Sequence, residues 1–585
     1  MPENLLNEIF AEGITAEKRR KKFITFSHDD ENSSPDRIFF FLILLIFGMG
    51  LLAAKLFTLT ILEGPRYRQL AAENRLREVK ITAARGIIYD RNNNVLVRNI
   101  PLFTDERGKQ FFEEKPASAS GQMRESLTRG YPFGQAFAHV LGYIGEINEE
   151  EIVNLSAKYK YAAADLVGKI GIEQSYDTLL RGKDGREVYE VDALGQIVRV
   201  LGRFEPSAGN NLKLTLDAKL QQIAAQELTG KKGAVIAAIP ATGEILTLYS
   251  SPSFDPNSFI RGEGVEQILV QEDQPLFNRS IAGLYAPGST FKIVVALAGL
   301  EHNIITPGTV FEDTGILKVG NFSFGNWYFL QYGKKDGMVD IIKALQRSND
   351  IFFYKAGEAI GIEKLADFSR KLGIGNTLGI DINGEEVGIM PDPQWAQKVR
   401  GSSWFLGNTY HVSIGQGDLL VTPLNVNSWT NLIAGNGRLC KPHLTGAADS
   451  AICKDMGLKP ASIELVREGM KLACAPGGTG WPLFNFKVIN DKLKPDGIDF
   501  LDTFESTTSG QKKVEIQTAC KTGTAEFGPS SLRSSGQVKT HAWFTVFAPA
   551  ANPQISITVL IEGGGEGSTN AAPIARKMLE EWFGR

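Results

Sequence analysis

The feature that most constrains this chain of 585 residues is an apolar run close to its N-terminus. Ile38 to Ala54 are 17 consecutive residues without a charged or strongly polar side chain, and beyond Lys55 the run continues from Leu56 to Leu62. At about 1.5 Å per residue, a helix through both parts spans a bilayer core of about 30 Å. The sequence therefore predicts a membrane anchor over residues 38–62.

The charges around this run predict its orientation. Arg37 stands at its edge, and a basic cluster precedes it at Lys18, Arg19, Arg20, Lys21 and Lys22. Because positive charge stays on the cytoplasmic side, we expect residues 1–37 to form a cytoplasmic tail and the 523 residues after Leu62 to lie outside. A cleaved signal peptide and a buried core helix are the alternatives. A signal peptide generally has a shorter tail and an apolar stretch of only about 7–15 residues.

Composition indicates a folded chain and excludes several classes of protein. Hydrophobic residues make up 43% and charged residues 22%, as in ordinary folded domains rather than disordered or collagen-like chains. The net charge of −3 gives no reason to expect a nucleic-acid partner. Four cysteines are too few for a disulfide scaffold, and none forms a C-x-x-C pair of the kind found in zinc ribbons.

Two folded regions are predicted beyond the anchor. Residues 63–209 are polar, with short β-like runs and many turns, and residues 185–200 alternate as a β-hairpin does. Residues 204–211 contain a proline, a glycine and two asparagines, which predicts a linker. Residues 210–585 then form the second region.

The second region has an α/β pattern. Two early strands are expected at 233–239 and 244–249, and three late ones at 514–519, 542–547 and 554–561, with helices at 217–228 and 572–582. The pattern predicts a mixed α+β fold, with one antiparallel five-stranded sheet assembled from both ends of the region and flanked by helices. The middle of the chain is expected to form an inserted all-α lobe, with an active site between lobe and sheet.

The first of three short motifs is Ser289-Thr290-Phe291-Lys292, followed by helical sequence. Residues three apart on a helix share a face, so the Lys292 amine can reach the Ser289 hydroxyl. A desolvated lysine with a lowered pKa can remove the proton from a serine nucleophile. Alone, this pattern is weak evidence and is more typical of a serine that caps a helix, followed by an exposed lysine.

The second motif, Ser348-Asn349-Asp350, precedes an apolar helix and also resembles a helix cap. The third, Lys521-Thr522-Gly523-Thr524, is predicted at the end of a strand, where a lysine and a hydroxyl can receive a carboxylate and Gly523 lets the backbone approach closely. Together, in this order, the motifs are those of serine β-lactamases and penicillin-binding proteins.

With these motifs, the chain resembles the class B penicillin-binding proteins, most closely the elongation-type penicillin-binding protein 2. The resemblance extends over nearly the whole part outside the membrane. It includes the segments 84–91 (ARGIIYDR), 171–173 (GIE), 233–257 (GAVIAAIPATGEILTLYSSPSFDPN), 277–279 (FNR), 379–381 (GID) and 413–424 (SIGQGDLLVTPL).

The resemblance implies a peptidoglycan DD-transpeptidase with an elongated, mainly-β pedestal (63–209) and a transpeptidase domain (210–585). Ser289 would attack the D-alanyl-D-alanine carbonyl of a stem peptide, with Lys292 as general base. Ser348 and Asp350 would relay protons and orient Lys292, and Lys521 would support Ser348. Thr522 and Thr524 would bind the substrate carboxylate, and the N–H groups of Ser289 and Thr524 would form the oxyanion hole.

The resemblance also implies β-lactams as inhibitors, no cofactor, and a polytopic glycosyltransferase of the SEDS family and elongation-complex proteins as partners at the membrane. Two alternatives use the same sequence features. One is a β-lactam hydrolase or sensor with the same acylation site, which does not need a region as large as 63–209. The other is a non-catalytic cell-wall scaffold, which does not need three intact motifs.

Some residues depart from the family pattern. Asp350 replaces the asparagine common elsewhere in the family. Some elongation-type members hold a metal between the first two motifs, but here that interval has no cysteine and only His302, so no zinc is predicted. Cys520 is expected to be a buried free thiol, because free cysteine is among the most buried residue types. Whether Cys440 and Cys453 pair is left open.

Overall fold

The computed structural model describes residues 35–105, 107–114, 123–155, 161, 165–192, 194, 196–446, 451–490, 500–506, 512–528 and 539–585. The chain divides into two compact units. The smaller unit contains the chain up to Val79 together with Val188–Gly202, and the larger contains Lys80–Glu187 and Arg203–Arg585. The basic cluster predicted to orient the anchor lies outside the described residues.

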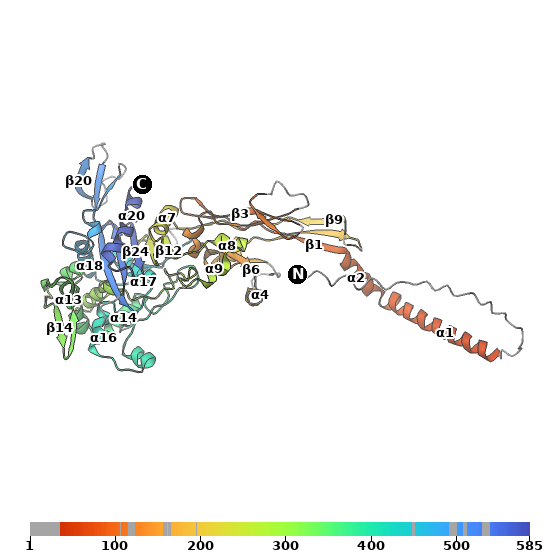
Figure 1. Ribbon diagram of the computed structural model, residues 1–585, viewed down its shortest axis with the longest axis horizontal. Helices are drawn as coiled ribbons and strands as arrows, with labels where there is room; N and C mark the ends of the chain where they lie inside the picture. Colours follow the sequence, from red (N-terminus) through yellow and green to blue (C-terminus); the bar gives the residue numbers. More distant parts are fainter. Residues whose placement is uncertain are drawn as a thin grey trace, which may run out of the picture. The chain divides into compact units, whose positions relative to one another are not determined.

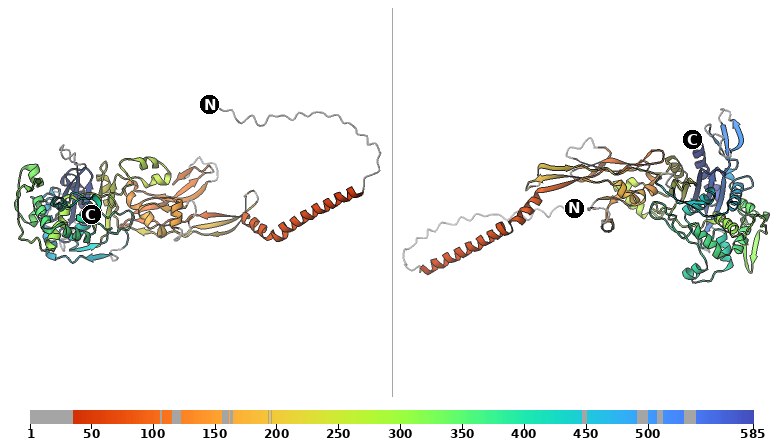
Figure 2. Two further views of the ribbon diagram at one scale, coloured as in Figure 1. Left: turned by 90° about the horizontal axis from the view of Figure 1, so that it is seen from below. Right: turned by 180° about the vertical axis from the view of Figure 1, so that it is seen from behind.

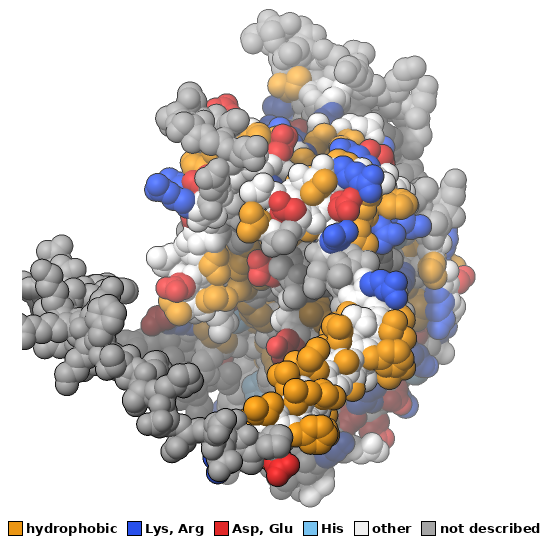
Figure 3. Space-filling model, turned by 90° about the vertical axis from the view of Figure 1, so that its right-hand side faces the viewer, with side chains coloured by type: hydrophobic (Ala, Val, Ile, Leu, Met, Phe, Trp, Pro, Cys, Tyr) orange, Lys and Arg blue, Asp and Glu red, His pale blue; other side chains and the backbone are white. Residues whose placement is uncertain are grey.

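The smaller unit begins with the predicted apolar helix. Helix α1 (Pro35–Phe57) continues as a π-helical turn, η1 (Thr58–Leu62). Its hydrophobic side chains are exposed and gather along one ridge in Figure 3. The hydroxyls of Thr58 and Thr60 donate to the carbonyls of Ala54 and Leu56, each at 2.6 Å, so these polar groups are satisfied without water. Asp36–Leu62 is thus long and apolar enough to cross a bilayer.

Helix α2 (Gly64–Arg75) leads into a three-stranded sheet with the order β1-β8-β9. Its strands are β1 (Leu76–Ile81), β8 (Gly185–Val191) and β9 (Ile197–Phe204). Strands β8 and β9 are neighbours, as the alternation of residues 185–200 predicts.

The pedestal part of the larger unit (residues 80–187 and 203–214) combines a sheet with short helices. The sheet has the order β10-β2-β3-β4, and β5 also pairs with β3. Residues 204–211, expected to be a linker, are packed against this part: the Gly209 N–H donates to the Ala84 carbonyl at 2.9 Å, and the Asn210 N–H to the Leu179 carbonyl at 3.0 Å. The elements are β2 (Ile88–Tyr89), β3 (Val95–Thr104), β4 (Gln110–Phe112), β5 (Arg124–Gly130), η2 (Gly134–Ala136), α3 (Ala138–Leu141), β6 (Ile144–Glu146), α4 (Glu149–Leu155), β7 (Leu166–Gly168), α5 (Gly171–Ser175), α6 (Asp177–Leu180) and β10 (Leu212–Lys213).

A buried charge cluster stabilises the pedestal part. Glu173 is completely buried and accepts hydrogen bonds from Arg129 Nε at 2.8 Å and from Arg85 Nη2 at 2.9 Å. Arg85 also donates to Asp177 at 2.7 Å. Buried charges are tolerated only when they are paired. Arg85 of segment 84–91 and Glu173 of segment 171–173 therefore stabilise each other.

We expect Glu173→Gln to lower the free energy of unfolding by about 3–5 kcal/mol, because it removes the carboxylate that pairs with buried Arg129 and one of the two that pair with Arg85. Urea unfolding followed by circular dichroism measures the change. The matched control is Glu205→Gln, which breaks an exposed pair with Arg203 and should cost less than about 1 kcal/mol. Equal losses in the two variants would show that the buried cluster is not stabilising.

The remainder of the larger unit is built on an antiparallel five-stranded sheet with the order β12-β11-β24-β23-β22. Strands from the two ends of this region thus lie side by side (Figure 1). They are β11 (Gly233–Ala238), β12 (Ile245–Ser251), β22 (Ala519–Phe527), β23 (Lys539–Ala548) and β24 (Ile555–Ile561).

Both faces of this sheet are covered. On β23, Phe544 and Val546 belong to the core formed with α7 (Ala218–Glu227) and α20 (Ala572–Phe583). Trp543 and Phe547 belong to the core on the other face. The side chains therefore alternate between two cores with the period of a strand. Figure 2 shows α20, next to the C label, beside the strands from two further sides.

The prediction of a sheet strand at 514–519 was wrong in its position. Strand β21 (Lys512–Ile516) belongs to a separate sheet with β19 (Lys487–Ile489) and β20 (Phe500–Ser506). The main-sheet strand begins only at Ala519. Because both strands alternate similarly, the sequence does not reveal that the chain changes partners between them.

The middle of the chain is mainly helical, but the prediction of an all-α lobe was wrong. Two-stranded antiparallel sheets lie within it, including β13 (Phe311–Asp313) with β16 (Gly337–Val339) and β14 (Ile316–Val319) with β15 (Phe322–Gly325). Its helices include α10 (Lys292–Glu301), α11 (Trp327–Tyr332), α12 (Ile341–Arg347), α13 (Asp350–Ile360), α14 (Ile362–Lys371), α16 (Leu406–Ser413), α17 (Pro423–Ala434) and α18 (Pro460–Ala473). The shorter elements are α8 (Pro256–Arg261), α9 (Val265–Val270), η3 (Gly288–Phe291), α15 (Pro393–Trp395), η4 (Ala396–Arg400), β17 (Arg438–Cys440), β18 (Cys453–Asp455), η6 (Trp481–Leu483) and η7 (Gly567–Ala571).

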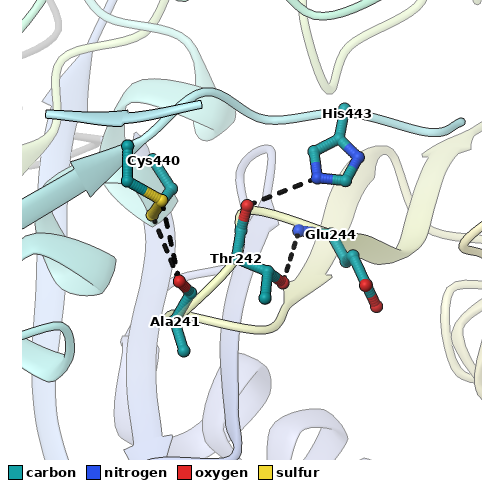
Figure 4. The surroundings of a disulfide bond; sticks show 6 residues. Ala241, Thr242, Glu244, Cys440 and His443 are labelled. Atoms are coloured by element: carbon teal, nitrogen blue, oxygen red, sulfur yellow. Dashed lines mark hydrogen bonds between the residues drawn. A yellow bond between two sulfur atoms is a disulfide. The ribbon is translucent and has the colours of Figure 1, made fainter. Parts of the chain in front are cut away.

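All four cysteines form disulfides. Cys440 and Cys453 join the paired strands β17 and β18, next to the turn that contains Ala241 and Thr242 (Figure 4). Cys474 pairs with Cys520, so the prediction of a free thiol at Cys520 was wrong. Cys520 is buried as expected, but its partner is 46 residues away in the sequence and is brought close only by the packing of α18 on β22.

Candidate active site

The first motif forms a tight turn at the start of a buried helix. Ser289 lies in η3, and Lys292 is the first residue of α10. Residues three apart in a 3₁₀ turn eclipse one another, so the two side chains share a face. Pro287 occupies the N-cap position without a side-chain bond, so Ser289 is not a helix cap. Among the described residues, its hydroxyl has no hydrogen-bond partner, and the side chain is half-buried.

Lys292 is completely buried and is held by the second motif. Its Nζ donates to Asp350 Oδ1 at 2.6 Å and to the Ser348 carbonyl at 2.8 Å, and lies 3.3 Å from Ser348 Oγ. Burial lowers the pKa of Lys292, and the Asp350 carboxylate opposes this shift without cancelling it. The site therefore makes the neutral, proton-accepting form of the amine easier to reach.

Ser348 adopts an unusual backbone conformation between α12 and α13. Its φ of 53° and ψ of 38° are left-handed, which costs a residue other than glycine on the order of 1–2 kcal/mol. In this conformation both its carbonyl and its hydroxyl accept hydrogen bonds from the buried lysines. Backbone strain at a site is typical of residues whose position matters for function.

Lys521 approaches the same hydroxyl from the sheet. It is completely buried, and its Nζ donates to Ser348 Oγ at 2.8 Å and to the Thr522 carbonyl at 3.0 Å. Burial and the nearby positive charge of Lys292 hold the pKa of Lys521 well below its ordinary value. Ser348 Oγ is thus bonded to two amines, one from each side.

The third motif lies inside β22 rather than at the end of a strand, because β22 starts two residues before Lys521. A Cβ at Gly523 would lie 3.0 Å from Thr290 Cγ2 and 3.1 Å from the Pro287 carbonyl oxygen. Because Gly523 has no side chain, the strand can pack closely against the turn that contains Ser289. Thr522 is nearly buried, whereas Thr524 is exposed on this edge strand of the sheet.

The structure adds residues that the sequence did not reveal. The Trp327 N–H donates to Asp350 Oδ2 at 2.9 Å, and the Asn326 side chain accepts from the Asp350 N–H at 3.1 Å. Asp350 is therefore fixed on both sides, by Lys292 and by the start of α11. No spacing rule links residues 326–327 to the second motif, so sequence reasoning had no signal for them.

The buried carboxylate of Asp313 holds Asn326 and Asn349 in position. Asp313 Oδ2 accepts from Asn326 Nδ2 at 2.8 Å and from Asn349 Nδ2 at 3.0 Å. Asn349 in turn caps α13 by accepting from the Phe352 N–H at 2.9 Å. The helix-cap interpretation of the second motif thus holds for Asn349, while Ser348 and Asp350 contact the lysines.

Of the predicted site residues, hydrogen bonds join Lys292, Ser348, Asp350 and Lys521, and the turn that contains Ser289 packs against β22 at Gly523. In the described part of the chain, no group of three or more His, Cys, Asp or Glu side chains is placed to hold a metal. The absence of zinc stays a prediction.

A serine turn, two buried lysines and an edge strand define a serine acyl-transfer site of the penicillin-binding type. The chain belongs to the penicillin-binding protein transpeptidase family. Residues 233–580 match the penicillin-binding protein transpeptidase domain, and residues 109–214 match the penicillin-binding protein dimerisation domain.

Similar proteins place the chain within this family. The peptidoglycan D,D-transpeptidase MrdA of Acinetobacter baumannii is 33% identical, over 94% of this chain and 87% of that protein. MrdA of Salmonella typhimurium is 32% identical, over 94% and 96%. Among solved structures, penicillin-binding protein 2 of Helicobacter pylori in complex with MreC has a TM-score of 0.71 at 28% identity, covering 87% of this chain and 98% of that one. A chain of a peptidoglycan synthase complex has a TM-score of 0.70 at 26% identity, covering 94% and 98%. The resemblance to penicillin-binding protein 2 is confirmed.

Proposed function

We propose that this chain is a peptidoglycan D,D-transpeptidase that cross-links stem peptides through an acyl-enzyme on Ser289 during cell-wall elongation. The observation that carries the proposal is the double hydrogen bond of Ser348 Oγ, which joins Lys292 to Lys521 beside the Ser289 turn. Such an arrangement supplies both a base for the nucleophile and a path for its proton.

In the first half-reaction, Ser289 Oγ forms a bond to the carbonyl carbon of the penultimate D-alanine. Its proton moves to neutral Lys292 Nζ. When the tetrahedral intermediate collapses, the C–N bond to the terminal D-alanine breaks, and that amine takes the proton. In the second half-reaction, a side-chain amine of another stem peptide forms a bond to the acyl carbonyl carbon, the ester C–O bond to Ser289 breaks, and the proton lost by the amine returns to Ser289 Oγ.

Residues of the second motif stabilise the amine that carries this proton and provide a path for its transfer. Asp350 stabilises Lys292 when the lysine carries the proton, at an Nζ–Oδ1 distance of 2.6 Å. The Ser348 hydroxyl bonds both amines and therefore lets a proton move between them. Among the described residues, the Asp350 carboxylate contacts Lys292 and no carboxylate contacts Lys521, so charging both buried amines at once is costly.

Substrate binds along β22. This strand is the edge of the sheet, and its outer backbone groups can pair with an extended peptide. Thr522 and Thr524 bind the terminal carboxylate, and the N–H groups of Ser289 and Thr524 stabilise the developing oxyanion. Each such donor is worth about 3–4 kcal/mol in related chemistry.

The proposal is tested with a stem pentapeptide ending in D-alanyl-D-alanine and a fluorescent D-amino acid as acceptor. We expect one free D-alanine for each fluorescent product, and neither product with Ser289→Ala. Catalytic consumption of penicillin without D-alanine release would instead identify a hydrolase. No reaction with peptide or with penicillin would identify a scaffold.

The membrane arrangement is part of the proposal. Residues 1–37 form the cytoplasmic tail, 38–62 the anchor, 63–209 the pedestal and 210–585 the extracytoplasmic transpeptidase domain. The pedestal and anchor bind a polytopic SEDS-family glycosyltransferase and other elongation-complex proteins. The similar structures support this, since one is a complex with MreC and another a peptidoglycan synthase complex. A detergent pull-down that recovers no polytopic membrane protein would contradict it.

A further inference from the structure

The Cys474–Cys520 disulfide lies directly beside the candidate active site. It joins Cys474, the residue that ends α18, to the second residue of β22. The next residue along β22 is Lys521. Both cysteines are buried, with exposed fractions of 5% and 0%. The crosslink therefore acts inside the fold at the point where the third motif begins.

The loop that follows the crosslink contacts the third motif and the residue that precedes the second motif. We call residues 474–480 the strap. Thr479 Oγ1 lies 2.8 Å from Thr522 Oγ1, within hydrogen-bond distance of the third motif. The Gly477 carbonyl accepts from Arg347 Nη1 at 2.8 Å, and Arg347 is the chain neighbour of Ser348. The strap thus connects the third motif to the residue that precedes the second.

The strap is also packed tightly on the crosslink. The Gly480 N–H donates to the Ala473 carbonyl at 2.8 Å, which closes the loop at its base. A Cβ at Gly480 would lie 2.5 Å from Cys520 Sγ, so the loop passes over the sulfur with no room for a side chain.

Position on the sheet explains why a covalent bond is useful here. Strand β22 is held by a neighbouring strand on one side only. It also carries the completely buried Lys521 amine, for which the structure shows two oxygen acceptors and no contacting carboxylate. Burying such an amine is unfavourable because the charged form loses its hydration. Desolvation therefore favours a position of the strand in which Lys521 is turned toward water. A crosslink one residue away opposes that movement.

We propose that the Cys474–Cys520 disulfide positions Lys521 and Thr522 for acylation of Ser289, and that the reduced chain is acylated slowly. This inference rests on the proposed function. The bond is made when the two thiols lose two protons and two electrons to the disulfide of a dithiol oxidase, which becomes a dithiol as the new S–S bond forms. An extracytoplasmic thiol oxidase must therefore act before the enzyme is fully competent.

The chain offers a matched control in its second disulfide. Cys440 and Cys453 connect β17 to β18 beside Ala241 (Figure 4), and neither cysteine adjoins one of the three motifs in the sequence. The test compares the full-length double variants Cys474→Ala/Cys520→Ala and Cys440→Ala/Cys453→Ala in detergent. For each variant, the rate of acylation by a fluorescent penicillin is measured across a range of pH and divided by the amount of folded protein. Its dependence on penicillin concentration separates the affinity for penicillin from the rate of the acylation step.

We expect the Cys474→Ala/Cys520→Ala variant to be acylated at least about tenfold more slowly, mainly in the acylation step. Its pH profile should move upward, because a Lys521 amine that turns toward water no longer repels the protonated Lys292 amine, whose deprotonation sets the rise with pH. The control pair should remain within about twofold of wild type with an unchanged profile. A variant that only unfolds more easily, with wild-type rate and profile per folded molecule, would overturn the inference.

A second measurement serves if the double variant does not fold. Wild-type chain is refolded with limiting oxidant, labelled with penicillin and treated with a thiol alkylator. Intact-mass spectrometry of the alkylated chains then reports, chain by chain, how many thiols were reduced and whether the adduct is present, and the Cys440→Ala/Cys453→Ala variant treated in the same way leaves Cys474–Cys520 as its one disulfide. We expect the adduct to be enriched at least about tenfold in chains with the Cys474–Cys520 bond. Equal labelling of chains with and without it would overturn this inference alone, whereas no adduct on fully oxidised wild type would overturn the proposed function.

Discussion

Replacing Ser289 with alanine is expected to abolish acylation by penicillin while leaving the thermal unfolding midpoint nearly unchanged. The nucleophile supplies the bond that defines the reaction, so its loss should lower the acylation rate on the order of 10⁴-fold or more. The Ser289 hydroxyl makes no hydrogen bond within the described part of the chain, so its removal should shift the midpoint by no more than about 2 °C. Intact-mass spectrometry and differential scanning fluorimetry measure the two quantities.

Ser403→Ala is the control, because Ser403 is exposed on a loop and should keep both the wild-type rate and the midpoint. If Ser289→Ala were strongly unfolded, Ser289 would be a structural residue rather than the nucleophile.

Replacing Lys292 with methionine is expected to slow acylation by about 10²–10⁴-fold, the usual contribution of a general base. Methionine fills a similar volume but cannot accept the Ser289 proton. The variant also leaves the carboxylate of Asp350 without the amine at 2.6 Å, so we expect lower stability as well. The rate is therefore measured on the folded fraction, below the unfolding midpoint, by penicillin labelling.

The pH dependence tests the same role of Lys292. Only the neutral amine accepts a proton, so the wild-type acylation rate should rise with pH as Lys292 deprotonates. Burial lowers the pKa of Lys292, so this rise should be complete at a lower pH than for a lysine with the ordinary value of 10.5. Lys292→Met should lose this rise. Lys364→Met, at an exposed position of α14, should retain it, and a fall of less than tenfold in Lys292→Met would exclude Lys292 as the base.

The sequence predicted much of this site because its motifs are local. Ser289 and Lys292 are three residues apart, and the short motifs 348–350 and 521–524 each carry their own chemistry. These three segments meet at the Ser348 hydroxyl. Their meeting could be predicted only because the three motifs match the pattern of a known family. The apolar anchor was likewise predictable, because an apolar run of this length is typical of a helix that spans a membrane.

Other features depend on contacts that the sequence does not encode locally. Cys520 finds Cys474 only because α18 packs on β22, so composition alone favoured a free thiol. Asp313 lies 37 residues before Asp350 and supports it through Asn326, a path that no spacing rule describes. No proline or glycine interrupts residues 512–522, and only the structure shows that β21 and β22 belong to two different sheets.

The most direct test of the central claim is the mass of the full-length chain after mixing with penicillin, followed over hours and then mapped to a peptide. We predict one adduct per chain that persists over this period and maps to the peptide containing Ser289. An adduct on a different residue would contradict the assignment of the nucleophile. An adduct that disappears within seconds while penicillin is consumed catalytically would contradict a transpeptidase and indicate a hydrolase.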